Sequence, residues 1–114
     1  METHRLVLTE DLNQYGFLFG GRLLSWVDEA GFIAASNDFP NARFVTIGMS
    51  KVEFRKSVKN GSVVRIVVER SKMGRTSVCY RVDIYSTKEP ERGVIFATEI
   101  TYVNVDETGE KLPL

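Results

Sequence analysis

The residue with the clearest potential for chemistry is Asp28, an acidic residue in the middle of an otherwise apolar stretch. A carboxylate in such surroundings is costly unless it is paired, hydrogen-bonded or turned toward a cavity. In a cavity it could act as a general base on a water molecule or attack a carbonyl group itself, and the residues alone do not choose between these roles. The plainer alternative is that Asp28 borders the polar side of its helix and reaches solvent past Ser25.

Three residues that precede this stretch could assist such a carboxylate. Asn13 carries a carboxamide that could donate to a carbonyl oxygen or orient a water, although an asparagine in a loop commonly holds a turn. Gly20 and Gly21 stand at the start of the apolar stretch, where unpaired backbone N–H groups and the positive end of a helix dipole would meet. These N–H groups suit the oxyanion that forms when a carbonyl is attacked. The alternative is a tight turn from loop to helix.

Basic and hydroxyl side chains gather at two turns further along the chain. Phosphate groups are bound by cations and by N–H or hydroxyl donors, so these turns could serve a phosphate-bearing ligand. The alternative is ordinary solvated surface charge, which is the favoured explanation for Lys59. The candidate residues are Arg55, Lys56, Gly74, Arg75, Thr76 and Ser77.

Other reactive residues are poor candidates for catalysis. His4 is the only histidine and stands at an apparent strand start without a partner motif, so we expect it on the surface. Cys79 is the only cysteine, has no paired base in the sequence and is expected to be inert. Glu29 lies about 100° around the helix from Asp28, which favours a contact with solvent or with a second subunit. No cluster of histidine, cysteine or carboxylate residues has the spacing of a metal site.

One long helix must position Asp28. A helical pattern without proline covers residues 22–35 and ends in the polar residues that lead to Pro40. Its polar residues fall on one narrow stripe, and because the remaining surface is apolar, we expect the helix to be largely buried. A flank with Trp26 and Ile33 also needs cover from outside a single curled sheet. The stripe consists of Arg22, Ser25, Glu29 and Ser36.

The rest of the chain is typical of β-strands. The connections between the strands are too short for helical crossovers, so we expect consecutive strands to pair as antiparallel hairpins. The predicted fold class is α+β: one long central helix wrapped by a curved antiparallel sheet of about five strands. Such a sheet keeps open edges, which favours pairing with a second copy. The expected strands are residues 4–9, 44–54, 62–71, 76–86 and 94–105; within residues 76–86, alternation predicts that Val78, Tyr80, Val82 and Ile84 share one face.

Length and composition narrow the class of protein. A chain of 114 residues predicts a single domain, residues 1–114. Lys and Arg number 15, as do Asp and Glu, so no net charge draws the protein to nucleic acid. No apolar run approaches the roughly 20 residues that cross a bilayer, and the N-terminal residues lack the apolar core of a signal peptide. With its single cysteine, the chain is expected to be cytoplasmic.

Three segments resemble one known family. Residues 13–31, NQYGFLFGGRLLSWVDEAG, resemble the N-x-x-G-x-x-F/H-G-G-x-x-L/M-x-x-x-D-E-A-G signature of acyl-CoA thioesterases with the hotdog fold. The branch is that of the brain-type acyl-CoA hydrolases and the bacterial YciA-like enzymes. Residues 52–62 resemble its F-x-K-P-V-x-x-G-D strand and turn, and residues 73–77 its V-G-R-T/S-S turn. Phe17 stands where many members have a polar residue and could alter the acyl preference.

The resemblance implies that the protein hydrolyses a fatty acyl-CoA to a free acid and coenzyme A. It implies that Asp28 is the catalytic carboxylate, that Asn13 of the partner subunit positions the water or the carbonyl, and that Gly20 and Gly21 form the oxyanion hole. It further implies at least a homodimer, with tetramers or hexamers as larger assemblies. Coenzyme A is then part of the substrate, and no cofactor or metal is implied. The six candidate residues at the two turns become its expected binding residues.

Two other functions are compatible with these residues. A non-catalytic acyl-CoA-binding protein or sensor could share the fold, but it would not need a carboxylate such as Asp28 at the carbonyl. A hotdog dehydratase typically relies on a histidine beside the acidic residue, and His4 is poorly placed for that role.

Overall fold

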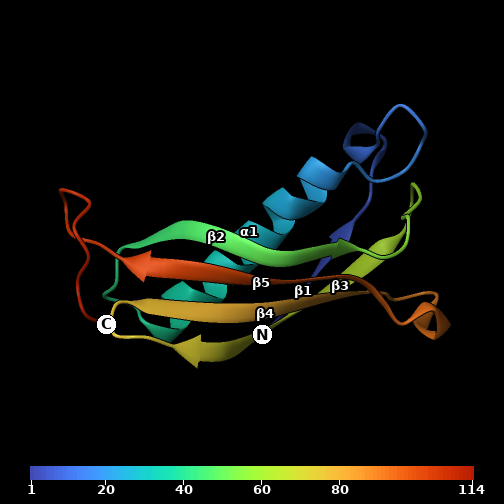
Figure 1. Cartoon of the computed structure of the whole chain (residues 1–114). Helices are drawn as coiled ribbons and strands as arrows, with labels where there is room; N and C mark the ends of the chain where they lie inside the picture. The colour runs from blue at the N-terminus through green and yellow to red at the C-terminus, as the bar shows by residue number, and fades with distance from the viewer.

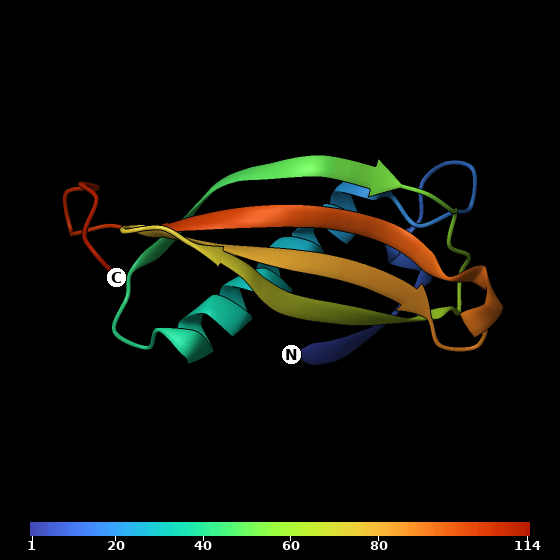
Figure 2. The same cartoon turned by 60° about the horizontal axis from the view of Figure 1, so that its bottom comes forward.

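The computed structural model describes residues 1–114 as one long helix lying across one face of a curved antiparallel sheet (Figure 1). Figure 2 shows the curvature of the sheet over the helix. No helix has the length and apolar character needed to cross a membrane. The elements in chain order are β1 (Glu2–Leu6), the 3-10 turn η1 (Thr9–Asp11), α1 (Gly20–Asp38), β2 (Phe44–Phe54), β3 (Val63–Met73), β4 (Ser77–Ser86), the 3-10 turn η2 (Pro90–Arg92) and β5 (Val94–Asn104).

The predicted architecture is confirmed, and the elements differ from the prediction mainly at their ends. Strand β2 has the predicted bounds, and β3, β4 and β5 begin and end within two residues of theirs. The first strand covers Glu2–Leu6 instead of residues 4–9, and the completely buried Val7 that follows it exchanges backbone hydrogen bonds with Gly61 and Ser62. Helix α1 begins at Gly20 rather than after the glycine pair, and the bond from the Phe39 N–H to the Ala35 carbonyl closes its last turn.

The predicted strand pairing is wrong at β1 and β2. The order in the sheet is β1-β3-β4-β5-β2, so only the β3–β4 and β4–β5 hairpins join consecutive strands. Strand β2 pairs with β5, and β1 pairs with β3. The prediction assumed that a short connection joins neighbours, but an extended connection over residues 55–62 can reach roughly 26 Å. That reach exceeds the about 14 Å across three strand spacings. Strands β1 and β2 are therefore the two edges of the sheet.

The core lies between α1 and the inner face of the sheet. On β4 the predicted inward residues Val78, Tyr80, Val82 and Ile84 are all buried. The helix contributes mostly small side chains at the contact, which lets it approach the sheet closely; its buried residues are Leu23, Trp26, Val27, Ala30, Gly31, Ala34 and Ala35.

The expectation of a nearly all-round buried helix is too broad for one chain. Phe32 and Ile33 are 43% and 45% exposed, so this flank is uncovered. Trp26 is only 6% exposed, because its own chain covers it and the Arg5 guanidinium lies 5.4 Å from its ring centre. The need for external cover therefore applies to Ile33 and not to Trp26.

Candidate active site

Asp28 is half-buried and hydrogen-bonded to the sheet. The Thr46 hydroxyl donates to Asp28 Oδ1 at 2.8 Å. The Tyr102 hydroxyl lies 2.8 Å from the Asp28 backbone carbonyl oxygen and 3.3 Å from Oδ1. The carboxylate therefore turns toward β2 and β5, which disfavours the alternative in which it simply reaches solvent past Ser25. Its second oxygen, Oδ2, makes no hydrogen bond within the chain.

Thr46 and Tyr102 are directly opposite each other on adjacent strands. Their Cα atoms are register partners of the β2–β5 ladder, so both hydroxyls come from one cross-strand pair. Burial raises the pKa of the Tyr102 hydroxyl, and the negative charge of Asp28 and the hydrogen bond to it raise it further. Tyr102 therefore stays protonated and acts as a donor. The sequence interpretation did not include this pair, because it did not predict that β2 and β5 are neighbours.

Asn13 holds a tight turn before α1. Its side-chain oxygen accepts hydrogen bonds from the Tyr15 N–H at 2.9 Å and the Phe17 N–H at 3.1 Å. Between them, Gly16 has φ +85°, a conformation that glycine adopts without strain. Asn13 therefore does hold a turn, which is the alternative role expected for a loop asparagine. The functional role is still compatible with it, because the Asn13 amide nitrogen makes no hydrogen bond within the chain.

Gly20 and Gly21 form the first turn of α1 with free donors. The Phe19 carbonyl accepts the N–H groups of Arg22 and Leu23, whereas those of Gly20 and Gly21 have no acceptor in the chain. A Cβ added at Gly20 would lie 3.3 Å from the Phe54 ring, so the absence of a side chain permits this packing. Gly20 borders a hollow of about 410 Å³, lined by Asn13, Phe17, Leu18, Gly20, Leu23, Phe54, Arg55, Lys56, Ser57 and Val58.

One chain does not bring all the predicted catalytic groups together. Gly20 and Asp28 are separated by about 12 Å along the helix axis. Asn13 lies with Gly20 at the start of α1 and shares no hydrogen bond with Asp28. The Asp28 carboxylate and the free N–H groups at the start of α1 therefore lie too far apart in one chain to act on the same carbonyl.

The predicted phosphate-binding residues fall at opposite ends of the sheet (Figure 1). Arg55 and Lys56 follow β2 near the start of α1, and each is engaged: Arg55 lies 3.3 Å from Glu53, and the Lys56 ammonium donates to the Arg92 carbonyl. The second group, Gly74, Arg75, Thr76 and Ser77, joins β3 to β4 at the other end.

The second group, residues 74–77, forms a hydrogen-bonded turn that carries the unpaired Arg75 guanidinium. Within it, the Gly74 N–H donates to the Ser77 carbonyl at 2.8 Å, and the Arg75 carbonyl accepts the Leu114 N–H at 2.9 Å. The exposed Arg75 guanidinium makes no ion pair or hydrogen bond in the chain. Thr76 and Ser77 are half-buried beside it.

The residues set aside as poor candidates lie away from Asp28. His4 is exposed on β1. Cys79 is half-buried, and its sulfur lies 3.1 Å from the Thr101 hydroxyl. Glu29 is exposed and forms an ion pair with Arg5 at 2.5 Å.

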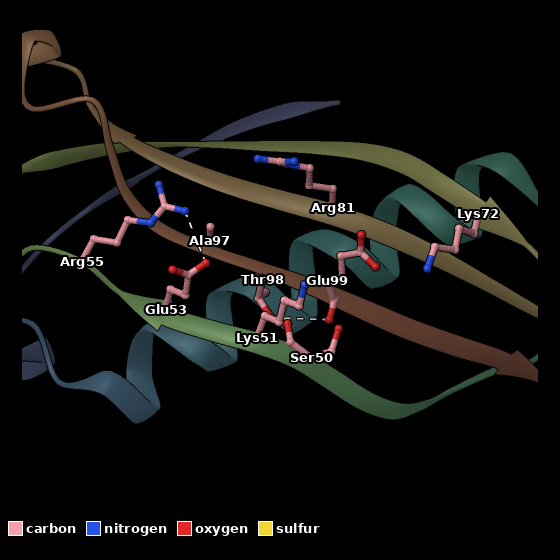
Figure 3. Close-up of a pocket in the computed structure, with 9 residues that line it drawn as sticks. All are labelled: Ser50, Lys51, Glu53, Arg55, Lys72, Arg81, Ala97, Thr98 and Glu99. Carbon is pink, nitrogen blue, oxygen red and sulfur yellow. Dashed lines mark hydrogen bonds and ion pairs between the residues drawn. The ribbon is translucent and has the colours of Figure 1, made fainter.

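A second hollow of about 410 Å³ lies on the sheet and is lined mainly by charged and polar residues (Figure 3). Arg81, one of its members, alternates along β4 with the buried Tyr80 and Val82, so it points away from α1. Its lining residues are Ser50, Lys51, Glu53, Arg55, Lys72, Arg81, Ala97, Thr98 and Glu99. This hollow shares Arg55 with the hollow at the start of α1 and contains none of the proposed catalytic residues.

Comparison with known proteins gives consistent matches. The model of the thioesterase superfamily matches residues 15–92. The acyl-CoA thioester hydrolase YciA of Salmonella typhimurium is 33% identical, over 96% of this chain and 85% of that protein. A hexameric thioesterase from Yersinia pestis has 30% identity and a TM-score of 0.89, over 98% of this chain and 92% of that chain.

A third related protein was studied with mutations of an asparagine and an aspartate, the residue types of Asn13 and Asp28. The acyl-CoA hydrolase of Staphylococcus aureus, solved as an asparagine-to-alanine mutant in complex with coenzyme A, has 25% identity and a TM-score of 0.88, over 99% of this chain and 68% of that chain. It was also solved as an aspartate-to-alanine mutant. The two mutated positions are separated by the same number of residues as Asn13 and Asp28.

Proposed function

The chain belongs to the thioesterase superfamily, among the acyl-CoA thioester hydrolases of the hotdog fold, and from this premise we propose that it hydrolyses a fatty acyl-CoA. In this reaction the oxygen of water adds to the thioester carbonyl carbon, the C–S bond breaks, and the coenzyme A thiolate leaves and takes up a proton. The observation that carries the proposal is the carboxylate of Asp28, held by Thr46 and Tyr102 with one oxygen free.

The free oxygen of Asp28 is the reactive atom in this proposal. Oδ1 is held by Thr46, so Oδ2 is the atom that faces water or substrate. As a general base, Oδ2 takes a proton from water as the water attacks. As a nucleophile, it attacks the carbonyl carbon and forms a mixed anhydride, which water then hydrolyses. Both routes consume one water and release one acid and one coenzyme A.

The N-terminus of α1 supplies the oxyanion hole in this proposal. The N–H groups of Gly20 and Gly21 have no acceptor in the chain and stand at the positive end of the helix dipole. When the carbonyl carbon becomes tetrahedral, its oxygen gains negative charge, and donors aimed at this oxygen lower the barrier. The amide nitrogen of Asn13, in the same hollow, is a further free donor for the carbonyl or for the water.

A two-fold dimer would bring these groups to Asp28. We place the interface on β2, the longer edge strand, where Val45 and Ile47 are 43% and 59% exposed. Antiparallel pairing of two β2 strands sets the Phe54 end of one copy beside the Phe44 end of the other. Since Gly20 packs against Phe54, the partner's Asn13 and glycine pair would then approach Asp28. The spacing of the mutated pair in the Staphylococcus aureus enzyme supports this assignment of Asn13 and Asp28.

The same dimer would also reunite the two groups of phosphate-binding candidates. The partner's Arg55 and Lys56 would move to the end of the sheet that carries the turn from Gly74 to Ser77. Coenzyme A carries several phosphate charges, so separated cations can engage different parts of it. In this arrangement the unpaired Arg75 guanidinium is the strongest single candidate.

Assembly, cofactor and location complete the proposal. We propose that the protein is a homo-oligomer, with the homodimer as its smallest active unit and the hexamer, the state of the related enzymes, as the full assembly. Coenzyme A enters only as part of the substrate, without a resident cofactor or metal. The free thiol of Cys79 fits the reducing environment of the cytoplasm, where we place the protein.

The test is a hydrolysis assay with acyl-CoA substrates of increasing chain length. Release of free thiol that depends on enzyme concentration and disappears in Asp28→Ala is the expected result. Tight acyl-CoA binding without thiol release at any chain length would instead identify a binding protein or sensor, and would overturn the proposed activity.

A further inference from the structure

We propose that Tyr102 is a positioning residue for Asp28. We further propose that residue 31 is a glycine because the Tyr102 hydroxyl occupies the space that a Cβ of Gly31 would fill. This inference rests on the proposed function, in which Asp28 acts on water or on the thioester. The contact between Tyr102 on β5 and Asp28 on α1 fixes the distance of the carboxylate from the sheet and its orientation.

The Tyr102 hydroxyl contacts both the backbone and the side chain of Asp28. It lies 2.8 Å from the backbone carbonyl oxygen and 3.3 Å from Oδ1. A contact with the backbone fixes the helix itself, whereas a contact with Oδ1 fixes the rotation of the side chain. Thr46 holds the same Oδ1 from the neighbouring strand. The two hydroxyls thus leave Oδ2 as the free oxygen, and Tyr102 has no need to touch substrate.

The Tyr102 ring is held from several sides. Its side chain is completely buried, and edge-to-face contacts join it to the rings of Phe32, Phe44 and Tyr80, each with centroids 6.2 Å apart. A ring in such packing cannot turn without displacing its neighbours. The hydroxyl is therefore presented to Asp28 at a constant place.

Gly31 lies on the same side of α1, one helical turn after Asp28. A Cβ at this position would come under 3.0 Å from the Tyr102 hydroxyl and 3.2 Å from Ile100 Cγ2. Its backbone does not need glycine, since Gly31 does not have a positive φ. Glycine is unfavourable inside a helix, so the reason for it here is the close approach of Tyr102.

A second tyrosine supplies a matched control. Tyr80 lies on β4, is 1% exposed, and donates its hydroxyl to Asp38 Oδ2 at 2.7 Å. It therefore makes the same type of bond to the same helix, but near the end of α1 rather than at the proposed site. Replacing either tyrosine by phenylalanine removes one buried hydroxyl and keeps the ring.

The first experiment compares Tyr102→Phe with Tyr80→Phe by kcat, KM and Tm. A misplaced catalytic group costs about 10- to 100-fold in rate, and we expect that loss in kcat for Tyr102→Phe with KM within about twofold. Tyr80→Phe should lower Tm by about as much as Tyr102→Phe does, but leave kcat within about twofold of wild type. Equal kcat values for the two variants would overturn the inference.

The second experiment uses Gly31→Ala alone and combined with Tyr102→Phe. The single change should lower Tm and kcat, because the new methyl group displaces the hydroxyl. In the double variant the hydroxyl is gone, so adding Gly31→Ala should lower Tm much less than it does in wild type. Additive Tm changes would contradict the role of Gly31 even if one variant were inactive.

The two proposals fail in different ways. A wild-type protein that hydrolyses acyl-CoA while Tyr102→Phe behaves like Tyr80→Phe would overturn only the positioning role. A folded wild-type protein with no turnover on any acyl-CoA would overturn the proposed function and the positioning role with it.

Discussion

Two hollows of about the same volume, 410 Å³, lie in different chemical surroundings. The hollow at the start of α1 is lined half by hydrophobic residues, including Leu23 and Phe54, with Asn13 and Gly20 at its border. The hollow on the sheet has Ala97 as its one hydrophobic residue among charged and polar side chains such as Arg81 (Figure 3). The first offers apolar surface to a ligand, whereas the second offers almost none.

The comparison teaches that volume alone does not identify the site. An acyl thioester needs apolar walls for its chain and free donors for its carbonyl. The α1 hollow offers both, because Leu23 and Phe54 line it and the N–H group of Gly20 at its border has no acceptor. On the sheet, by contrast, the Arg81 guanidinium already pairs with the Asp83 carboxylate at 2.9 Å.

The largest expected effect is the loss of turnover in Asp28→Ala. Removing a general base costs about 10²- to 10⁴-fold, and kcat should fall by that much with little change in Tm. Glu29→Ala is the matched control, since the neighbouring carboxylate is exposed and pairs with Arg5. An Asp28→Ala protein with near-wild-type hydrolysis would show that catalysis does not use the carboxylate that the proposed dimer brings to the α1 hollow.

The next effect is the return of activity when two inactive variants are mixed. If Asn13 and the partner's Asp28 form one site, a mixed dimer of Asn13→Ala and Asp28→Ala subunits keeps one intact site. Random exchange should restore about a quarter of wild-type activity. The assay follows thiol release after subunit exchange, with each variant alone as the control. No recovery despite demonstrated exchange would place each complete site within one chain.

A smaller effect is expected from the phosphate-binding candidates. Arg75→Ala and Lys56→Ala each remove one charge-assisted contact, which costs about 1.5–3 kcal/mol. This loss should raise KM roughly 10- to 100-fold and change kcat little. Lys59→Ala is the control, because it removes an exposed lysine that is not assigned to coenzyme A. If KM is unchanged in both variants, coenzyme A binds elsewhere.

The smallest effect is expected from the hollow on the sheet. Arg81→Ala breaks an exposed ion pair with Asp83, and such pairs contribute about 0–1 kcal/mol to stability. We expect kcat and KM within about twofold of wild type. An increase in KM comparable to that of Arg75→Ala would reverse the comparison and assign coenzyme A to this hollow.

Local sequence patterns determined much of this structure. Alternation in β4 predicted the inward face of Tyr80 and Val82, and the bounds of β2 were predicted without error. The helical pattern placed Asp28 on a face with Gly31, a small residue that permits a close contact. These features depend on residues a few positions apart, which is the range over which periodicity carries information.

Only the tertiary structure decided what Asp28 touches. Thr46 and Tyr102 meet because β2 crosses to the far edge of the sheet and pairs with β5. The same strand order places Arg55, which follows β2, at the opposite end of the sheet from Arg75, which lies between β3 and β4. Strand order is set by how the whole sheet covers α1, and this packing energy is a sum over distant residues that no local pattern contains.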